Sequence, residues 1–181
     1  KDHDLDCVVC GAFGPTRDLT NDDPAIVKQG MYYIESCFQI CNDLGTSFLA
    51  GPMYSAVGKA RLLPEDQKRI EWNRALENLR KVCESAQTKG LEIALEPLNR
   101  FETDLINRTE DVVRLIDDIN HPSAKILLDG FHMNIEEPCI AQGIRDGGDK
   151  IGHVHFVDSN RQAAGRGHMD HAPIAAALNE I

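Results

Sequence analysis

Short apolar runs alternate along the chain with longer segments in which apolar residues recur every three or four positions. The short runs have the length of buried strands, and the longer segments have the spacing of amphipathic helices. The predicted strands cover residues 6–13, 46–53, 91–98, 125–131 and 151–157. No hairpin signal joins consecutive strands, so each connection is expected to pass through a helix.

Helix boundary signals support this alternation. Asp23 and Pro24 suit the cap and the first turn of a helix that stops before Gly45. Gly90 stands where glycine commonly ends a helix. The predicted helices cover residues 21–44 and 64–89, a segment that starts near 109, residues 137–145 and a segment that starts near 171.

Alternating strands and helices imply a parallel α/β fold, because each crossover helix returns the chain to the end of the sheet at which every strand begins. Two architectures satisfy this order, an open doubly wound sheet and a (β/α)8 barrel. A nucleotide-binding open sheet is disfavoured, since no G-x-G-x-x-G follows a predicted strand and no Walker loop is present. The placement of polar side chains at strand ends favours the (β/α)8 TIM barrel.

Three successive strands each end in a side chain that can bind a metal or move a proton. Alternation puts Glu96, Asp129 and His155 on the face opposite the apolar residues that would meet the helices. In (β/α)8 enzymes the active site is assembled at the carboxyl ends of the strands. Carboxylate oxygens and imidazole nitrogens that converge there suit Mn2+, Mg2+, Co2+ or Zn2+.

Each polar residue also has a structural interpretation when it is taken alone. Glu96 is in the position of a solvated loop residue or a cap, and Asp129 begins a common Asp-Gly turn pair. His153, on the same face as His155, could be a buried core residue whose ring nitrogens are hydrogen-bonded. The strands therefore favour a metal site because three of them repeat the pattern, and these alternatives stay open.

Composition narrows the class of protein. The 181 residues carry 19 Lys and Arg against 29 Asp and Glu, a formal net charge of −10, with 42% hydrophobic and 27% charged residues. These proportions are typical of a globular domain, and the acidic balance argues against nucleic acid as the main partner. No apolar run is long enough for a membrane span, and no leader is recognisable. We expect a cytoplasmic protein without a membrane or nucleic-acid partner.

Six cysteines raise the alternatives of disulfides or a zinc site. Cys7 and Cys10 form a C-x-x-C inside the first predicted strand, which would be buried, and no second pair follows at zinc-finger spacing. Cys37, Cys41 and Cys83 fall on the apolar faces of predicted helices. The expectation is reduced and mostly buried thiols.

Longer motifs carry a family resemblance. Residues 96–102 read E-P-L-N-R-F-E, residues 128–137 read L-D-G-F-H-M-N-I-E-E, and residues 152–155 read G-H-V-H, with S-N-R at 159–161. Together they closely resemble the ketose 3-epimerases, the D-tagatose/D-psicose 3-epimerase group of the xylose-isomerase-like TIM barrel superfamily. The resemblance covers nearly the whole chain. Gly130 and Asp170 depart from it, at positions where the epimerases often carry Thr and Trp.

The resemblance implies particular site residues. The metal ligands would be Glu96, Asp129 and His155. The residues that hold the O1 and O2 oxygens of the sugar would be Glu102, His132 and Arg161. His132 is expected on the loop that follows the strand of Asp129. The cofactor expected is a divalent metal, Mn2+ first and Mg2+, Co2+ or Zn2+ otherwise, with a fourth ligand, a Glu, on the final barrel strand.

The chemistry implied is C3 epimerisation of a free ketose. The proton beside a ketone is too weakly acidic to leave unaided, so a metal that holds the C2 and C3 oxygens would stabilise the enediolate. By resemblance, Glu96 would remove the proton from one face and the final-strand Glu would return one to the other face.

Other functions stay open. Aldose–ketose isomerases of the hydroxypyruvate isomerase type and inosose dehydratases share the barrel and its strand-end carboxylates. A DNA repair enzyme of the endonuclease IV type would need more His ligands and a basic surface. An inactive barrel fragment that binds sugar or nothing is the non-enzymatic alternative.

Length bears on that last alternative. A (β/α)8 barrel needs about 250 residues, and five strand–helix units are recognisable in the 181 residues. By comparison with the family they would hold the third to seventh strands, with two strands missing before Asp6 and one after Ile181. We expect residues 1–181 to be a single, incomplete barrel domain that binds metal weakly and catalyses poorly by itself. A homo-oligomer would be in keeping with the family.

Overall fold

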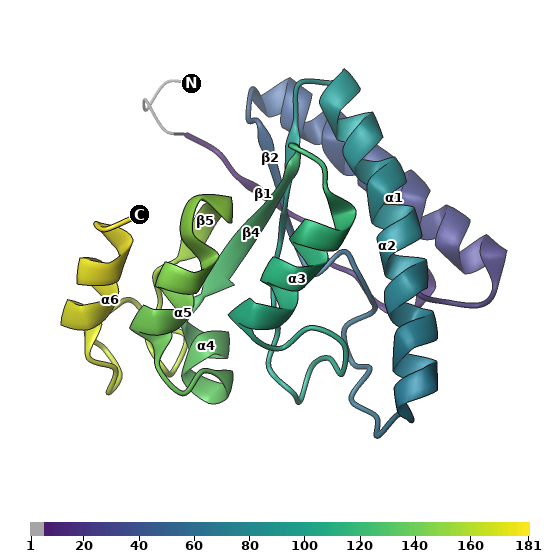
Figure 1. The fold of residues 1–181 in the computed structure, drawn as a ribbon. Helices are drawn as coiled ribbons and strands as arrows, with labels where there is room; N and C mark the ends of the chain where they lie inside the picture. The colour runs from purple at the N-terminus through teal and green to yellow at the C-terminus, as the bar shows by residue number, and fades with distance from the viewer. Residues whose placement is uncertain (1–5) are drawn as a thin grey trace.

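The predicted strands form one parallel sheet in which each strand lies beside its neighbour in the chain (Figure 1). The computed structural model describes residues 6–181, and within them the strand order is β1-β2-β3-β4-β5. The strands are β1 (Val9–Cys10), β2 (Phe48–Gly51), β3 (Glu92–Leu95), β4 (Ala124–Asp129) and β5 (Ile151–His155). A doubly wound sheet reverses its strand order at a switch point, whereas a (β/α)8 barrel keeps a sequential order. The observed order is therefore that of a TIM barrel, of which these strands form an arc.

Helices connect the strands and follow the last one. They are α1 (Pro24–Leu44), α2 (Glu65–Thr88), α3 (Thr109–Ile119), α4 (Gly130–Glu136), α5 (Ile140–Gly147) and α6 (His171–Leu178), with short 3-10 helices η1 (Pro15–Arg17) and η2 (Gly148–Lys150). The predicted end of α1 before Gly45 is confirmed, and the helix starts at Pro24, three residues after the predicted start at 21. Asp23 caps it by accepting a hydrogen bond from the backbone N–H of Ala25 at 2.8 Å, and Gly45 ends it with a left-handed φ of 74°.

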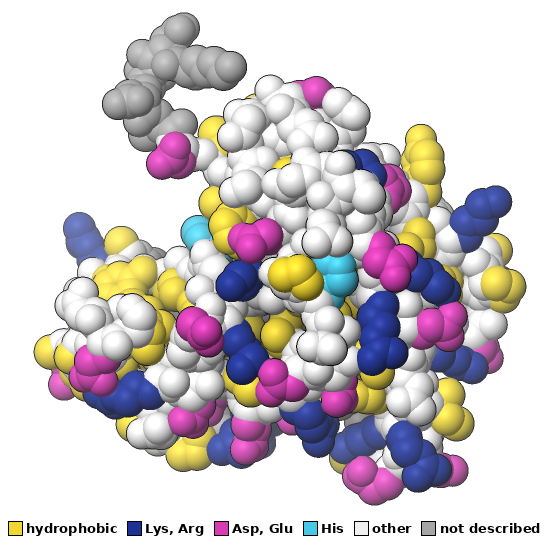
Figure 2. All heavy atoms as spheres, turned by 45° about the horizontal axis from the view of Figure 1, so that its top comes forward, with side chains coloured by type: hydrophobic (Ala, Val, Ile, Leu, Met, Phe, Trp, Pro, Cys, Tyr) yellow, Lys and Arg dark blue, Asp and Glu magenta, His cyan; other side chains and the backbone are white. Residues whose placement is uncertain are grey.

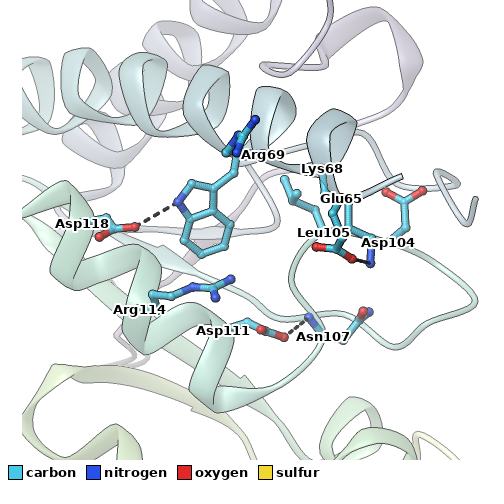
Figure 3. Close-up of a pocket in the computed structure, with 10 residues that line it drawn as sticks. Glu65, Lys68, Arg69, Asp104, Leu105, Asn107, Asp111, Arg114 and Asp118 are labelled. Carbon is cyan, nitrogen blue, oxygen red and sulfur yellow. Dashed lines mark hydrogen bonds and ion pairs between the residues drawn. The ribbon is translucent and has the colours of Figure 1, made fainter. Parts of the chain in front are cut away.

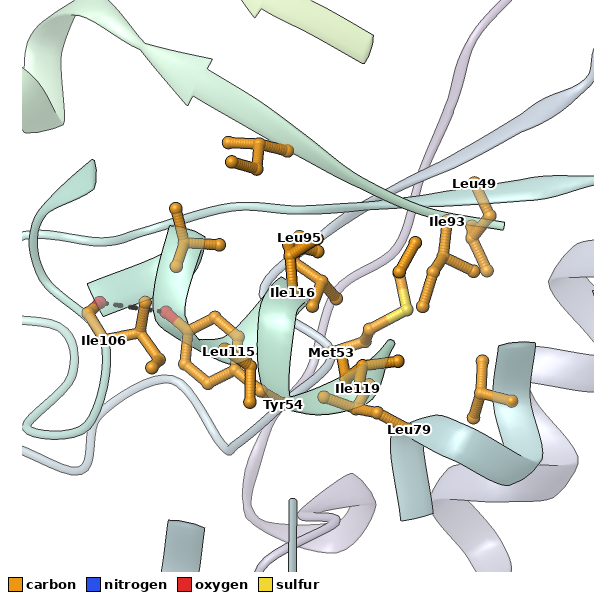
Figure 4. Packing of buried hydrophobic residues seen from close by; sticks show 14 of the residues in the cluster. Leu49, Met53, Tyr54, Leu79, Ile93, Leu95, Ile106, Leu115, Ile116 and Ile119 are labelled. Atoms are coloured by element: carbon orange, nitrogen blue, oxygen red, sulfur yellow. Dashed lines mark hydrogen bonds between the residues drawn. The ribbon is translucent and has the colours of Figure 1, made fainter. Parts of the chain in front are cut away.

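The two faces of the sheet differ as the alternation predicts. On the face covered by the helices, Leu49, Ile93 and Leu95 are fully buried in the main core, where helix residues pack against them (Figure 4). On the opposite face the side chains are smaller, and the buried cluster there consists of Ala50, Ala94 and Leu127, packed against Phe48. The second face corresponds to the interior of the barrel, and its strand ends carry the polar residues.

The hydrophobic pattern does not predict α4. The predicted strand at 125–131 ends at Asp129, and α4 begins at the next residue. Asp129 causes this change, because its Oδ1 accepts hydrogen bonds from the backbone N–H groups of Phe131 at 2.8 Å and His132 at 3.3 Å. The expectation of a loop at His132 is therefore wrong, since His132 lies in the first turn of α4. The next helix also starts later than predicted, at Ile140.

The expectation of mostly buried thiols is wrong for half of the cysteines. All six are free; the buried ones are Cys37, Cys41 and Cys83, and the exposed ones are Cys7, Cys10 and Cys139. Within residues 6–181, β1 has two residues and lies at one edge of the sheet. The C-x-x-C is therefore open to solvent instead of buried.

Buried carboxylates pair with the partly buried Lys59 and the more exposed Arg61 in the loop that precedes α2. Nζ of Lys59 lies 2.6 Å from Oε2 of Glu71 and 3.0 Å from Oδ2 of Asp18. Arg61 lies 2.8 Å from Glu71 and 2.8 Å from Asp104. Burial raises the pKa of Glu71, but the hydrogen bonds from Arg61 and Lys59 outweigh it and lower the pKa to about 2.

The outer surface carries mixed charge. On the face in Figure 2, Lys and Arg side chains lie between Asp and Glu side chains.

A hollow of about 490 Å³ between α2 and α3 is lined mainly by charged groups (Figure 3). In it, the indole N–H of Trp72 donates to Asp118 at 3.0 Å, and the guanidinium carbon of Arg114 lies 4.2 Å from the centroid of the Trp72 ring. This hollow contains none of the predicted site residues. Among the helices of residues 6–181, none is both long and apolar enough to cross a bilayer.

Candidate active site

Three predicted residues meet at the carboxyl ends of neighbouring strands. Glu96 follows β3, while Asp129 and His155 are the last residues of β4 and β5. Nδ1 of His155 lies 3.1 Å from Oδ2 of Asp129 and 3.6 Å from Oε1 of Glu96. One ligand atom from each residue lies within 4.8 Å of the other two. We call these three residues the strand-end cluster.

Register and packing fix the strand-end cluster. Asp129 and His155 are paired directly in the β4–β5 ladder, so their side chains leave the sheet side by side. The buried hydroxyl of Tyr54 lies 3.0 Å from the carbonyl oxygen of Glu96. It lies 3.2 Å from that of Ile106, a hydrogen bond drawn in Figure 4. Glu96 and Asp129 are 9% and 5% exposed. The two carboxylates are therefore held in place before any ligand arrives.

Asp129 uses its two carboxylate oxygens for different tasks. Oδ1 caps α4 by accepting from the backbone N–H groups of Phe131 and His132, while Oδ2 faces His155. The residue that starts the helix of His132 is thus also a member of the strand-end cluster. The position of His132 and the position of the cluster are coupled through this one side chain.

The electrostatics of the cluster favour a positive charge at its centre. Burial raises the pKa of Asp129, but the hydrogen bonds with the His155 side chain and the His132 backbone help to bring it below its ordinary value. Hydrogen bonds with Asp129, Cys10 and Glu96 raise the pKa of His155 to about 11. The carboxylates that favour a proton on His155 would equally hold a divalent cation in its place. Two carboxylates and one imidazole at this spacing fit a divalent first-row metal.

A second set of polar side chains is organised by Asn99. Its backbone N–H donates to Nδ1 of His132 at 3.1 Å, and its side-chain amide lies 2.8 Å from the same atom and 3.0 Å from Oε1 of Glu102. Nδ1 of His132 therefore accepts, which places the proton of the neutral ring on Nε2, 4.0 Å from Oε1 of Glu96. Burial lowers the pKa of His132 despite the carboxylates around it. His132 is thus a neutral donor aimed at the strand-end cluster.

Arg161 joins Glu102 from the turn that follows β5. Its NH1 lies 3.7 Å from Oε1 of Glu102, and its guanidinium carbon lies 4.6 Å from the centroid of the Phe131 ring. The side chain is 55% exposed. We call Glu102, His132 and Arg161 the wall group, because they stand on one side of the cleft described next.

The wall group and Glu96 line one hollow of about 550 Å³. Its other walls include the apolar side chains of Phe13, Val57 and Leu98. Asp129 and His155 adjoin this cleft through their contacts with Glu96. A cleft with one apolar side and a few converging polar groups suits a small polar ligand that must be held in one orientation.

Sequence reasoning does not single out two further residues near the site. Sγ of Cys10 lies 3.9 Å from Nε2 of His155, and Phe131 stacks with Arg161. Asn99 also shapes its loop by accepting from the backbone N–H of Phe101 at 3.0 Å. Its contact with His132 joins positions far apart in sequence and leaves no local signal. The one sequence signal for Cys10 is the alternation of side-chain direction along β1, which puts Cys10 on the face of the sheet that corresponds to the barrel interior.

The two departures from the epimerase motifs have local causes. A Cβ atom at Gly130 would lie 2.7 Å from the carbonyl oxygen of Val157, so this close backbone approach leaves no room for a side chain. Asp170 caps α6 by accepting from the backbone N–H of Ala172 at 3.1 Å. Neither residue lines the cleft.

The family model of the xylose isomerase-like TIM barrel matches residues 1–181. The chain therefore belongs to this family, as the motifs at the strand ends predict.

Two curated relatives are ketose 3-epimerases. An L-ribulose 3-epimerase of Methylomonas sp. (strain DH-1) is 35% identical over 164 residues, which are 91% of this chain and 56% of the relative. A D-psicose 3-epimerase of Enterocloster bolteae is 33% identical over 176 residues, which are 96% of this chain and 58% of the relative. The chain thus spans little more than half the length of these relatives.

A solved structure gives the same comparison. The crystal structure of a D-allulose 3-epimerase from Methylomonas sp. in complex with D-allulose matches with a TM-score of 0.87 and 33% identity. The match covers 94% of this chain and 58% of that one. The arc of strands described above therefore corresponds to part of that barrel.

Proposed function

We propose that the protein is a metal-dependent epimerase that inverts C3 of a free ketose. The observation that carries this proposal is the buried strand-end cluster, which adjoins a cleft lined by the wall group. The names of the relatives support it, since they are 3-epimerases of L-ribulose and D-psicose, and one related protein was crystallised with D-allulose. The substrate class that we propose is accordingly a ketopentose or ketohexose.

The strand-end cluster is the proposed metal site, with Mn2+ as the expected ion and Mg2+, Co2+ or Zn2+ as alternatives. A bound cation would polarise the ketone and stabilise the negative charge that develops when C3 loses its proton. Its three ligands would be Glu96, Asp129 and His155. The resemblance implies a fourth ligand, a Glu, on the final barrel strand.

The roles of the chain's own groups follow from their positions. Glu96 would accept the C3 proton, because its carboxylate lines the cleft and is largely shielded from water. Nε2 of His132 would donate to a sugar oxygen beside Glu96, while Glu102 and Arg161 would hold hydroxyl oxygens further along the wall. Inversion also needs a proton donor on the opposite face of the sugar, which the resemblance assigns to the final-strand Glu.

Exchange of the substrate proton tests the role of Glu96. The protein at its complete natural length, with Mn2+, is incubated with D-psicose in deuterium oxide, and loss of the C3 proton is followed by NMR. Glu96→Gln should slow the exchange by about 1000-fold, because general-base catalysis typically contributes 10²–10⁴. The matched control is Glu92→Gln, at the other end of β3, which should exchange at the original rate.

Undiminished exchange in Glu96→Gln would refute the assignment. Because Glu96 is also a proposed ligand, the Mn2+ affinity of the variant is measured separately by calorimetry. Loss of exchange at saturating Mn2+ then reports on proton transfer and not on an empty site.

The same assay separates epimerisation from the isomerase alternative. Aldose–ketose isomerisation exchanges a proton at C1 of the ketose, whereas 3-epimerisation exchanges the proton at C3. A panel of ketopentoses, ketohexoses, hydroxypyruvate and inosose extends the comparison. The single barrel domain, the cytoplasmic location and the homo-oligomer stay predictions, and light scattering of the purified protein tests the last of these.

A further inference from the structure

Arg161 occupies a strained position in a tight turn. Val157 and Ala163 form an antiparallel bridge, the backbone N–H of Asp158 donates to the carbonyl of Gln162 at 2.9 Å, and that of Arg161 donates to the carbonyl of Asp158 at 2.9 Å. A three-residue hairpin loop of this kind usually places glycine at its left-handed position. Here Arg161 takes that position, with φ of +62°, although side chains disfavour it.

The contacts of the Arg161 side chain do not explain this conformation. Its guanidinium lies 3.7 Å from Glu102 and 4.6 Å from the Phe131 ring, and neither contact is a hydrogen bond. The guanidinium therefore reaches the cleft because the backbone of the turn points it there. A residue with an unfavourable backbone conformation keeps it only where contacts made by other residues hold the backbone in place.

Asp158 supplies that support. Its side chain is fully buried, and its Oδ1 accepts from the backbone N–H of Ser159 at 2.7 Å, the hydroxyl of Ser159 at 3.1 Å and the backbone N–H of Met169 at 3.2 Å. Its Oδ2 accepts from the backbone N–H of Gly165 at 2.9 Å. The carboxylate also lies so close to Gly167 that a side chain there would collide with it. One carboxylate thus ties together both ends of residues 159–169.

The charge of Asp158 is balanced by these backbone dipoles. Burial raises the pKa of its carboxyl, but the N–H groups of Gly167, Ser159, Met169 and Gly165 hold it well below its ordinary value. The nearest basic side-chain atom among the ion-pair contacts of residues 6–181, Nδ1 of His171, is 3.9 Å away. The carboxylate therefore acts on the turn as an anion surrounded by amides.

We propose that Asp158 is the positioning residue for Arg161. It folds residues 159–169 into the one arrangement in which Arg161 accepts its left-handed conformation and holds its guanidinium over the cleft. This inference rests on the proposed function, in which Arg161 binds the sugar, and it assigns to Asp158 no contact with sugar or metal.

A double-mutant cycle tests the proposal. Asp158→Asn, Arg161→Ala and the double variant are prepared in the protein at its complete natural length, and KM and kcat for D-psicose are measured at saturating Mn2+. An asparagine amide must turn its NH2 toward a backbone donor, so Asp158→Asn should raise KM by about tenfold, the effect of roughly one lost hydrogen bond. With Arg161→Ala already present, Asp158→Asn should change KM by less than about twofold.

Two further measurements do not depend on turnover. In the metal-free protein, Asp158→Asn should accelerate amide hydrogen exchange in residues 159–169 and leave β4 unchanged. The Mn2+ affinity should stay as in the original protein. The matched control is Gln162→Ala, whose exposed side chain lies in the same turn and which should change none of these quantities.

Each outcome decides between the two proposals. Equal effects of Asp158→Asn with and without Arg161, or an unchanged KM, would overturn the positioning role. An unchanged KM in Arg161→Ala would instead overturn the sugar-binding role of Arg161 in the proposed function. If Asp158→Asn does not fold, Ser159→Ala removes one donor to the same carboxylate. A smaller rise in KM that vanishes without Arg161 would then support the proposal, and no rise would refute it.

Discussion

The strand-end cluster and the wall group face the same cleft, yet the fold holds them differently. The cluster stands at the ends of three paired strands, where the register sets the direction of each side chain. The wall group comes from the loop after Glu96, the first turn of α4 and the turn after β5. Its geometry depends on hydrogen bonds made by Asn99 and Asp158. Strand pairing thus fixes one half of the site, and side-chain hydrogen bonds within loops fix the other half.

This difference suits the two proposed ligands. A cation requires donor atoms at nearly fixed distances, which backbone pairing provides at low entropic cost. A sugar presents several hydroxyl groups, and recognising it requires polar groups that extend further from the sheet. Changes in the cluster should therefore act on metal affinity, and changes in the wall should act on sugar affinity.

Asp129 offers the strongest test of this separation, because it serves both halves. Asp129→Asn keeps an oxygen that can cap α4 but removes the charge that faces His155. Mn2+ affinity, measured by calorimetry, should fall by about 100-fold or more. Asp129→Ala should lose the same affinity and be about 1 kcal/mol less stable than Asp129→Asn in urea unfolding, because the cap is lost as well.

Asp23 provides the control for the cap. Asp23→Ala removes the equivalent N-cap of α1 and should lower the free energy of unfolding by about 1 kcal/mol without affecting Mn2+ binding. If Asp129→Asn bound Mn2+ as tightly as the original chain, Asp129 would not belong to the metal site.

The second prediction concerns Glu71, whose ion pair with Lys59 holds the loop that hydrogen-bonds to Glu102 of the wall group. The backbone N–H of Gly58 donates to the carbonyl of Glu102 at 2.7 Å, and the adjacent Lys59 is held by Glu71. The folded-state pKa of Glu71 is about 2 against an ordinary value of 4.5. Its stabilisation is therefore complete above about pH 4.5 and is lost as the pH falls toward 2, by at most about 3 kcal/mol.

Urea unfolding at pH 7, 5, 4 and 3 measures this contribution. Glu71→Gln should lower the free energy of unfolding at pH 7 and should flatten its decline between pH 4.5 and 3. Glu77→Gln in the same helix is the control, since Glu77 is 72% exposed and pairs with Lys81 on the surface, where water and salt screen the attraction. A pH profile unchanged by Glu71→Gln would show that the buried charges do not stabilise the loop.

The strand-end cluster can be predicted from the sequence pattern, whereas the geometry of the wall group cannot. Strand alternation predicts the common face of Glu96, Asp129 and His155, because a period of two fixes side-chain direction wherever a strand forms. The sequential strand order follows from the alternation of elements, and the choice of a barrel followed from where the polar residues fall. These parts depend on local patterns that repeat several times along the chain.

The wall group was reached through motif resemblance, and its geometry could not be predicted from local pattern. Asp129 followed by Gly130 is as typical of a turn as of a helix start, so the local pattern predicts neither α4 nor the position of His132 in it. The contact between Asn99 and His132 spans 33 positions and exists only once the strands are paired. Likewise, the exposure of Cys7 and Cys10 depends on which side of β1 is covered, which the apolar run does not indicate.

The smallest effect expected separates strain from recognition at Arg161. Arg161→Gly and Arg161→Ala both remove the guanidinium, so both should raise KM for the sugar by a similar factor. Glycine adopts the left-handed φ without strain, whereas alanine keeps most of it. In urea unfolding, Arg161→Gly should therefore be about 1 kcal/mol more stable than Arg161→Ala. Equal stabilities would mean that the left-handed conformation at Arg161 stores no strain.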